Sequence, residues 1–191
     1  MAEGDYASIT IRQLAVVSGV GLGSFYEYFA SKEDLARVCL HMRTKVLLAA
    51  LQGAIVQCAG SQLESMVAAL VEAHSGPHRE EPRAWRGHYL LERQLSGSEA
   101  YRKMYERFVD GWAEAIGAAA DPLAQPERQD AARVCLTILY GLFAHGHISA
   151  VDVPDLRTLS RQARYAIEGY LARLRIDCAP SLGSWPQAPG G

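Results

Sequence analysis

The spacing of apolar residues constrains the fold of this 191-residue chain more than any other feature. Along most of the chain, apolar side chains recur three and four positions apart, which places them on one face of an α-helix. Clear examples are the runs Leu63, Met66, Val67, Leu70, Val71 and Tyr101, Met104, Tyr105, Phe108, Val109, Trp112, Ile116. No alternating run is long enough to predict a strand, so we expect an all-α protein.

Capping boxes and breakers divide the chain into helices. In a capping box, a Ser or Thr side chain accepts from the backbone three residues on, and an acidic or amide side chain reaches back. The predicted boxes are Thr10 with Gln13, Ser31 with Asp34, Ser61 with Glu64, and Ser96 with Glu99. Breakers are expected at Gly76-Pro77, Pro82, Ser96-Gly97, Asp121-Pro122 and Asp152 to Pro154, where Asp152 could cap the last helix.

The segment 131–143 differs from the other helices because apolar residues cover most of its circumference. Such a helix must be buried on more than one side. A contact with a second subunit could supply the additional cover.

Composition excludes several classes of protein. No stretch approaches the roughly 18 uninterrupted apolar residues of a membrane span, and Glu3 and Asp5 stand where a secretory signal would need cations. We therefore expect a soluble, cytoplasmic protein without a membrane partner. The net charge of −2 argues against a polybasic coat but is compatible with DNA binding through a few placed cations.

Neither a metal site nor a catalytic site is predicted. The cysteines are scattered, without a Cys-x-x-Cys pair, and favour buried free thiols: Cys39, Cys58, Cys135 and Cys178. His74 and His78 are separated by the expected break at Gly76-Pro77, and His145 and His147 would lie about 200° apart on a helix. No nucleophile with a base, carboxylate pair or cofactor motif is evident, so we expect no enzyme and no cofactor.

Residues 10–32 have the layout of a helix-turn-helix, with helical patterns over 10–18 and 22–29 around a turn at 19–21. Gly19 permits the positive φ of a helix stop, and Val20 could fill the corner. Phe25 and Phe29 would anchor the inner side of the second helix. Its outer side is small, aromatic and polar, which suits a recognition helix in the major groove of DNA.

The predicted DNA-binding residues follow from this layout. Hydroxyls and one lysine would hold phosphates, while the first residues of the second helix face base edges, so affinity should fall with salt. The set comprises Thr10, Gly21, Leu22, Gly23, Ser24, Tyr26, Tyr28 and Lys32. A glycine-rich phosphate loop is disfavoured because no strand precedes it and the spacing is not G-x-G-x-x-G; a generic helical hairpin is the plainer alternative.

The stretch TIRQLAVVSGVGLGSFYEYFASKEDL, residues 10–35, resembles the DNA-binding region of the TetR/AcrR family of regulators. This resemblance implies the phosphate and base contacts named above and a palindromic DNA operator. It also implies a homodimer formed by the last two long helices, here about 127–148 and 154–176. An effector pocket in the preceding bundle would control the spacing of the two DNA-binding heads and release DNA when filled.

The chain departs from the family pattern before Tyr6. Family members carry a first helix of about four turns there, which packs across the head. We expect its absence to loosen the head, and to leave operator binding weak unless an upstream extension exists. Gly21 and Leu22 also replace a usual Ser and a polar or basic residue, and residues 1–50 hold five Lys or Arg against five Asp or Glu.

For any single aromatic residue in the middle of the chain ordinary core is the favoured interpretation, but their concentration there predicts an effector pocket among them. The candidates are Met66, Trp85, His88, Tyr89, Tyr105, Phe108, Trp112 and Tyr140.

We thus expect a truncated helix-turn-helix head over 1–35, a ligand-binding and dimerisation bundle over 36–177, and a flexible tail over 178–191. A long helix starting at Ser31 would link head and bundle. The predicted function is a ligand-responsive repressor. The alternative is a helical small-molecule-binding or dimerisation protein that has lost DNA binding.

Overall fold

The structure is a computed structural model that describes residues 6–95 and 97–177. Over these residues the chain forms helices and no strand, which confirms the all-α prediction. The elements are the 3-10 helix η1 (Tyr6–Ser8) and the α-helices α1 (Ile11–Ser18), α2 (Leu22–Tyr28), α3 (Lys32–Cys58), α4 (Leu63–Glu80), α5 (Pro82–Leu95), α6 (Ser98–Ala118), α7 (Gln125–Ser149) and α8 (Leu156–Asp177). The predicted tail lies outside the described residues.

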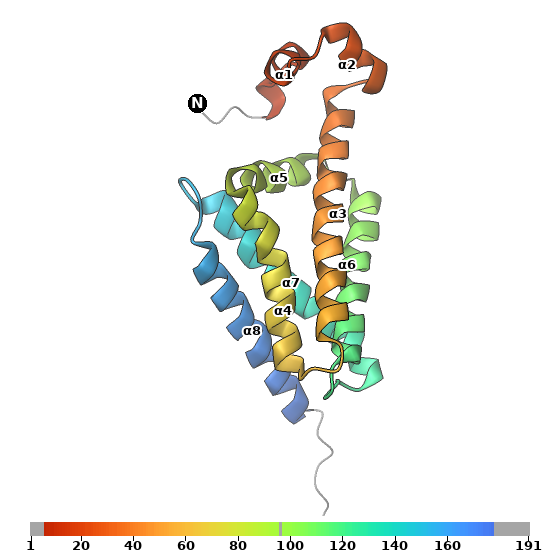
Figure 1. Cartoon of the computed structure of the whole chain (residues 1–191), viewed down its shortest axis with the longest axis vertical. Coiled ribbons are helices and arrows are strands. Elements are labelled where there is room, and N and C mark those ends of the chain that lie inside the picture. Colours follow the sequence, from red (N-terminus) through yellow and green to blue (C-terminus); the bar gives the residue numbers. More distant parts are fainter. Residues whose placement is uncertain (1–5, 96, 178–191) are drawn as a thin grey trace, which may run out of the picture.

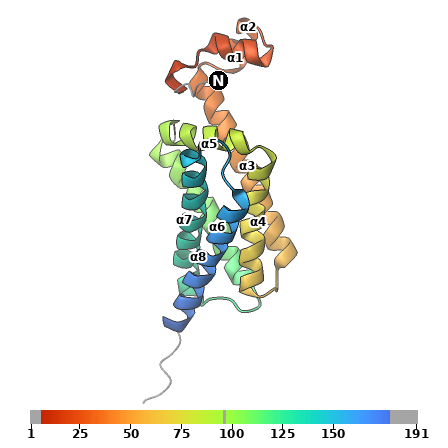
Figure 2. The same ribbon diagram turned by 90° about the vertical axis from the view of Figure 1, so that its left-hand side faces the viewer.

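A small head stands on a helical bundle (Figure 1). Helices α1 and α2 pack on each other at the far end of α3, which runs from the head down the length of the bundle. Helix α5 crosses the end of the bundle nearest the head. The remaining helices lie alongside α3, with α4 between α3 and α8, and α7 packed on both α6 and α8 (Figure 2).

The bundle core is continuous and is centred on α7. Ala131, Cys135, Leu139 and Phe143 of this helix are almost fully buried and contact side chains of its neighbours. Because α7 packs against α5, α6 and α8, the apolar circumference seen in its sequence is largely covered within one chain. Each fully buried Leu or Phe contributes roughly 1.5 to 3 kcal/mol to folding.

The N-caps in the structure confirm some of the predicted capping boxes and correct others. Thr10 forms the complete capping box with Gln13, and the Ser31 hydroxyl accepts from the Asp34 N–H at 3.1 Å. The Ser61 box was wrong, because Gln62 is the N-cap of α4 and makes no side-chain cap. The predicted Ser96 box involves a residue outside the described ones.

Three further predictions are corrected: a helix break, a helix cap and the burial of the cysteines. Helix α4 continues through Pro77 to Glu80, because proline removes one backbone donor without ending a helix that is packed along its length. At the start of α8, Asp155 rather than Asp152 accepts from the backbone, from the Arg157 and Thr158 N–H groups. Of the described cysteines, only Cys135 is buried, whereas Cys39 is exposed.

By length and composition alone, α3 and α7 could each cross a membrane. Core helices of water-soluble bundles pass the same test, and both helices here pack against several others. The two helices are therefore weak evidence for a membrane protein.

Asp121, in the connection between α6 and α7, takes the place of the missing Ser61 cap. Its Oδ1 accepts from the Leu63 N–H at 2.6 Å, and its Oδ2 accepts from Arg175 at 2.8 Å. One carboxylate thus joins the start of α4 to the end of α8 and closes the end of the bundle opposite the head.

Asp121→Ala should lower the free energy of unfolding by about 1 to 2 kcal/mol, because the cap and the charged contact are both lost. Asp121→Asn should cost less, since the amide oxygen still accepts from Leu63. Asp130→Ala, at an exposed position on α7, is the matched control. Urea unfolding measures all three, and equal stability of the Ala variant and the control would contradict this role for Asp121.

Candidate nucleic-acid interface and ligand cavity

The turn between α1 and α2 has the geometry of a helix stop. Gly19 has φ 69° and ψ 17°, in the left-handed region, and its N–H and that of Val20 bond to carbonyls of the last turn of α1. A residue with a Cβ would be strained at Gly19. Val20 is 43% exposed, so it fills the corner less than the sequence suggested.

Two phenylalanines fix the inner side of α2. Phe25 is buried and Phe29 partly so, and their ring centroids lie 5.5 Å apart. Ala15 of α1 and Ala36 of α3 are also buried, so both neighbouring helices contribute to the small core of the head.

The outer side of α2 presents the predicted DNA-binding residues to solvent. Tyr28 is 79% exposed and Tyr26 is 57% exposed. Gly21, Leu22, Gly23 and Ser24 are exposed as well. Thr10 is also exposed, but its hydroxyl and its N–H are engaged with Gln13. The structure brings these residues together on the head, and their contacts with DNA stay a prediction.

Lys32 differs from the other predicted residues, because its charge is used inside the head. Its ammonium donates to the carbonyls of Tyr6, Ala7 and Ile9 at 3.0 to 3.2 Å and lies over the Tyr6 ring, 4.8 Å from the centroid. Lys32 therefore fastens η1 to the start of α3, which favours a positioning role over a direct phosphate contact.

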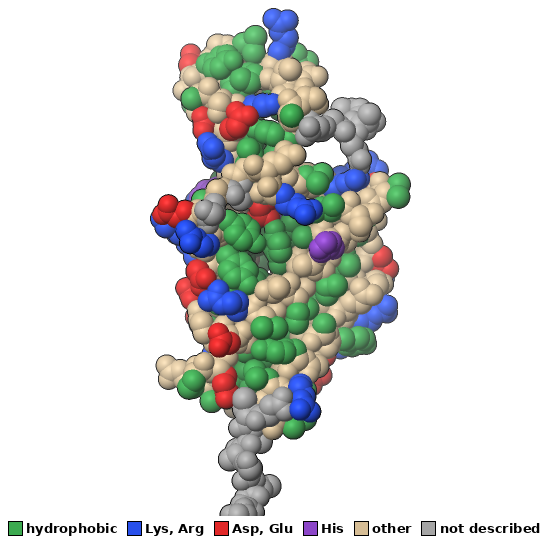
Figure 3. Space-filling view, turned by 180° about the vertical axis from the view of Figure 1, so that it is seen from behind, with side chains coloured by type: hydrophobic (Ala, Val, Ile, Leu, Met, Phe, Trp, Pro, Cys, Tyr) green, Lys and Arg blue, Asp and Glu red, His purple; other side chains and the backbone are tan. Residues whose placement is uncertain are grey.

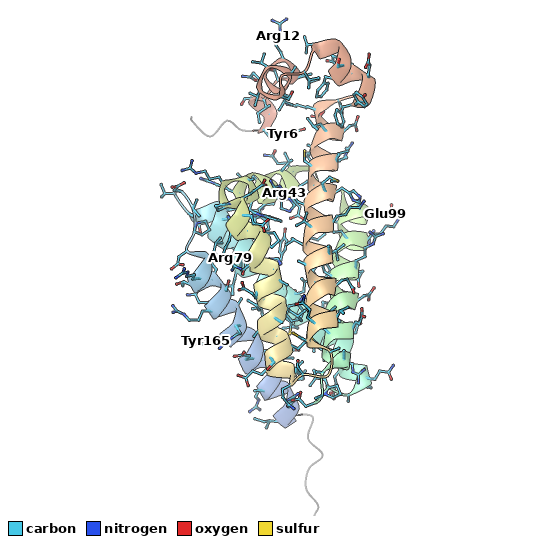
Figure 4. All side chains as sticks on the ribbon, in the orientation of Figure 1. Tyr6, Arg12, Arg43, Arg79, Glu99 and Tyr165 are labelled. Atoms are coloured by element: carbon cyan, nitrogen blue, oxygen red, sulfur yellow. The ribbon has the colours of Figure 1, made fainter. Side chains whose placement is uncertain are left out.

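Arg12 was missed by sequence reasoning. It is exposed in the first turn of α1, and its side chain points away from the molecule at the outer end of the head (Figure 4). The sequence did hold a signal for it, because Arg12 is a cation in the helix that precedes the turn and the head has few cations.

A narrow cavity lies in the bundle below the head, with about 40 Å³ of free space in this conformation. Helices α3, α4, α5, α6 and α7 all contribute to its wall, which is mainly apolar and aromatic. The lining residues are Thr44, Leu47, Leu51, Leu70, His74, His88, Glu92, Tyr101, Met104, Tyr105, Phe108, Trp112, Leu136, Leu139 and Tyr140.

The predicted ligand-binding residues divide into two groups. His88, Tyr105, Phe108, Trp112 and Tyr140 line the cavity. The others are fully buried core residues outside its wall, namely Met66, Trp85 and Tyr89. Contact of any of them with a ligand stays a prediction.

Glu92 is the wall residue whose chemistry sequence reasoning missed. It is 4% exposed, and the Tyr140 hydroxyl donates to its Oε2. Burial raises the pKa of Glu92 to about 7. Glu92 lies one helical turn after His88 on the same face of α5, and this spacing was the signal that could have found it.

Four histidines form a cluster beside the cavity, around His78. The His78 ring bonds to the His74 carbonyl at 2.8 Å and to the Tyr89 hydroxyl at 2.9 Å, and it stacks on Trp85 at 3.9 Å. The ring centroids of His147 and His78 lie 5.2 Å apart, and neither ring nitrogen of His147 has a hydrogen-bond partner among the described residues. Burial lowers the pKa of His74 to about 3, and the pKa values of His88 and His147 to about 4.

The histidine cluster should make the protein sensitive to acid. Below pH 6.5 the unfolded chain binds protons that the buried histidines cannot, so stability is lost as the pH falls toward their folded-state pKa values. Glu92 opposes this trend, because its raised pKa favours the folded state as the pH falls from 7 to 4.5. Because four histidines act in one direction and one carboxyl in the other, we predict a net fall in the free energy of unfolding as the pH falls. Each histidine contributes about 2 kcal/mol to this fall between pH 7 and pH 5.

His147→Phe should weaken this pH dependence and cost no stability at pH 7.5, because a ring of similar shape replaces one with two unpaired buried nitrogens. Urea unfolding at pH 5, 6 and 7.5 measures the effect, with the exposed His41→Gln as control. An unchanged pH slope in His147→Phe would contradict the account.

Among the described residues, no three His, Cys, Asp or Glu side chains are arranged to hold a metal ion.

Helix α3 connects the two candidate sites. Its first residue, Lys32, binds η1 in the head, and Thr44, Leu47 and Leu51 form part of the cavity wall. The Thr44 hydroxyl also contacts the Met104 sulfur of α6 at 3.3 Å, across the cavity wall.

Comparison with known protein families gives a match over the head. The model described as bacterial regulatory proteins, tetR family, matches residues 1–39. The chain finds no match among curated proteins and none among solved structures. The match covers η1, α1, α2 and the start of α3, and leaves the bundle to be interpreted from its own geometry.

Proposed function

We propose that this chain is a TetR-type transcriptional regulator, namely a cytoplasmic, ligand-responsive repressor that binds operator DNA as a dimer. The match of its helix-turn-helix head to the tetR family model supports the first part of this proposal. The observation that carries the proposal is the continuity of α3, which belongs both to the head and to the cavity wall. A molecule bound in the cavity therefore has a direct structural path to the head.

The head would bind DNA through the exposed side of α2. Tyr26 and Tyr28 would donate to phosphates on either side of the major groove, and Arg12 would add a charge-assisted phosphate contact. Leu22 and Gly23, at the start of α2, would lie nearest the base edges. Lys32 would act indirectly by holding η1 against α3.

The ligand would act by moving α3 relative to α6. Thr44, Leu47 and Leu51 face the cavity from one side, and Met104, Phe108 and Trp112 face it from the other. Filling the cavity would favour a conformation in which these two helices lie farther apart, and the head would follow α3. The ligand and DNA would then each prefer a different arrangement of the same helix.

The dimer would form through the outer faces of α7 and α8. Along α7, Val134, Ile138, Gly141 and His145 follow one another at spacings of four, three and four residues, and all are at least partly exposed. The same spacing recurs on α8, at the exposed residues Tyr165, Gly169, Ala172 and Ile176. Figure 3 shows this side of the bundle, on which hydrophobic side chains form bands and charged ones lie mostly toward the edges.

Small residues make these stripes suitable for close helix packing. A Cβ added at Gly141 or at Gly169 would meet no atom within 4 Å in the monomer. Two α7 and α8 pairs could therefore approach closely and form a four-helix interface, as in other helical bundles.

The DNA-binding proposal is tested by selecting duplexes from a random pool with the 191-residue chain. The enriched sequences should contain an inverted repeat, and Tyr28→Phe should weaken binding about fivefold through the loss of one hydroxyl. Arg12→Gln should lower the slope of log affinity against log salt by about one. Gel shifts over a range of salt measure both variants.

Arg157→Gln is the matched control for Arg12→Gln, because it removes the same charge from an exposed site on α8. Recovery of no inverted repeat would overturn the repressor proposal. It would favour the alternative, a helical ligand-binding or dimerisation protein without DNA binding.

The dimer interface is tested with arginine at its two glycines. Gly141→Arg and Gly169→Arg should each convert the dimer to a monomer, because a charged side chain would be buried at the contact. Gly53→Arg on α3 is the control, since that glycine is also exposed in a helix and has no atom near its Cβ position. All three variants should fold, since arginine favours helices more than glycine does.

Sedimentation velocity gives the oligomeric state and circular dichroism checks the fold. A dimer that persists in Gly141→Arg and Gly169→Arg would contradict the proposed interface.

A further inference from the structure

Glu92 lies where the cavity meets the surface. Besides the cavity, Glu92 and Tyr101 line two outer hollows. One, of about 370 Å³, lies beside α7 and includes Arg93 and His145. The other, of about 520 Å³, lies between α3 and α6 and includes Lys45 and Arg107. Glu92 therefore borders the cavity and both hollows.

The carboxyl of Glu92 lacks a compensating charge. Across residues 6–95 and 97–177, no Lys or Arg forms an ion pair with it, and its hydrogen-bond partner is the neutral Tyr140 hydroxyl. Tyr89 and Tyr101 also lie near it, and burial together with the Glu92 charge raises their pKa values. An ionised carboxylate in such a place is costly unless a cation joins it.

The wall around Glu92 is mainly apolar, but its aromatic rings favour a cation. Tyr101, Tyr105, Phe108, Trp112 and Tyr140 present aromatic rings to the cavity, and aromatic faces attract positive charge. The two histidines of the wall stay neutral near pH 7, because burial lowers the pKa of His74 to about 3 and that of His88 to about 4. They add hydrogen-bonding nitrogens without a competing positive charge.

The basic residues of the outer hollows do not occupy the same place. Arg37, Lys45, Arg93, Lys103 and Arg107 are all exposed, so salt screens their repulsion of a cation, with a screening length of about 8 Å at physiological salt. The attraction of the buried Glu92 carboxylate is screened much less.

We propose that the cavity takes a small aromatic organic cation, with Glu92 as its counter-charge and specificity-determining residue. This inference rests on the proposed function, in which the same cavity is the effector site. Glu92 would select for charge and the aromatic wall for shape, because a neutral ligand of the same shape gains only the second interaction.

The test compares two probes of nearly the same shape, benzyltrimethylammonium and its neutral carbon analogue neopentylbenzene. Quenching of tryptophan fluorescence reports binding, since Trp112 lies in the wall. At pH 8 the cation should bind at least about tenfold tighter than the neutral probe. Glu92→Gln should abolish this preference, and Glu114→Gln, an exposed site on α6, should preserve it.

The pH dependence gives a second readout. Because the pKa of Glu92 is about 7, affinity for the cation should fall about tenfold from pH 8 to pH 6. Neopentylbenzene should bind equally at both pH values, and the cation should bind equally to Glu92→Gln at both. His41→Gln and His145→Gln remove the histidines of the outer hollows and should leave the fall unchanged. Thermal unfolding checks that Glu92→Gln keeps its fold, since the amide oxygen can still accept from Tyr140.

Each contrary outcome has its own meaning. Equal or tighter binding of neopentylbenzene would overturn the preference for a cation and leave the cavity as a ligand site. A preference that survives Glu92→Gln would overturn the role of Glu92. If neither probe binds, both this inference and the ligand-responsive part of the proposed function fall, while DNA selection tests the head independently.

Discussion

The stiffness of α3 is the constraint on which the rest of the structure depends. The helix spans Lys32 to Cys58 without a proline, so it transmits orientation along its whole length. In the bundle, Leu47, Leu51 and Ile55 are buried against neighbouring helices. In the head, its first residue holds η1 and the residue after it through three backbone carbonyls. The position of the DNA-binding surface is thus set by packing in a different part of the molecule.

Local features of this fold could be predicted from the sequence because both partners of each interaction are close in the chain. The Thr10 cap is made by Gln13, the helix stop needs only Gly19, and the long linking helix starts one residue after Ser31. The predicted cap of α4 was wrong for the opposite reason. Its acceptor, Asp121, lies 58 residues beyond Leu63, and no local pattern identifies that pairing.

The same distinction applies to the two candidate sites. The face of α2 was predictable because a short helix beside a tight turn determines which residues point outward. The cavity is assembled from five helices, so the aromatic stripe of α6 indicated only one of its walls. Glu92 was missed because a carboxyl on a helix is ordinary in sequence. Its meaning comes from burial and from the absence of an ion-pairing partner among the described residues.

The length of α3 also determines how far the head moves for a given movement of the cavity wall. Ile55, near its buried end, is 23 residues from Lys32, or roughly 35 Å at 1.5 Å per residue. A tilt of about 5° around that end would displace Thr44 by about 1.5 Å, less than the width of a methyl group, and the head by about 3 Å. In a dimer the two heads would move in opposite senses, so their separation would change by up to about 6 Å. A side-chain rearrangement too small to disturb the core would thus shift each recognition helix by almost one base-pair step along DNA, whose rise is about 3.4 Å.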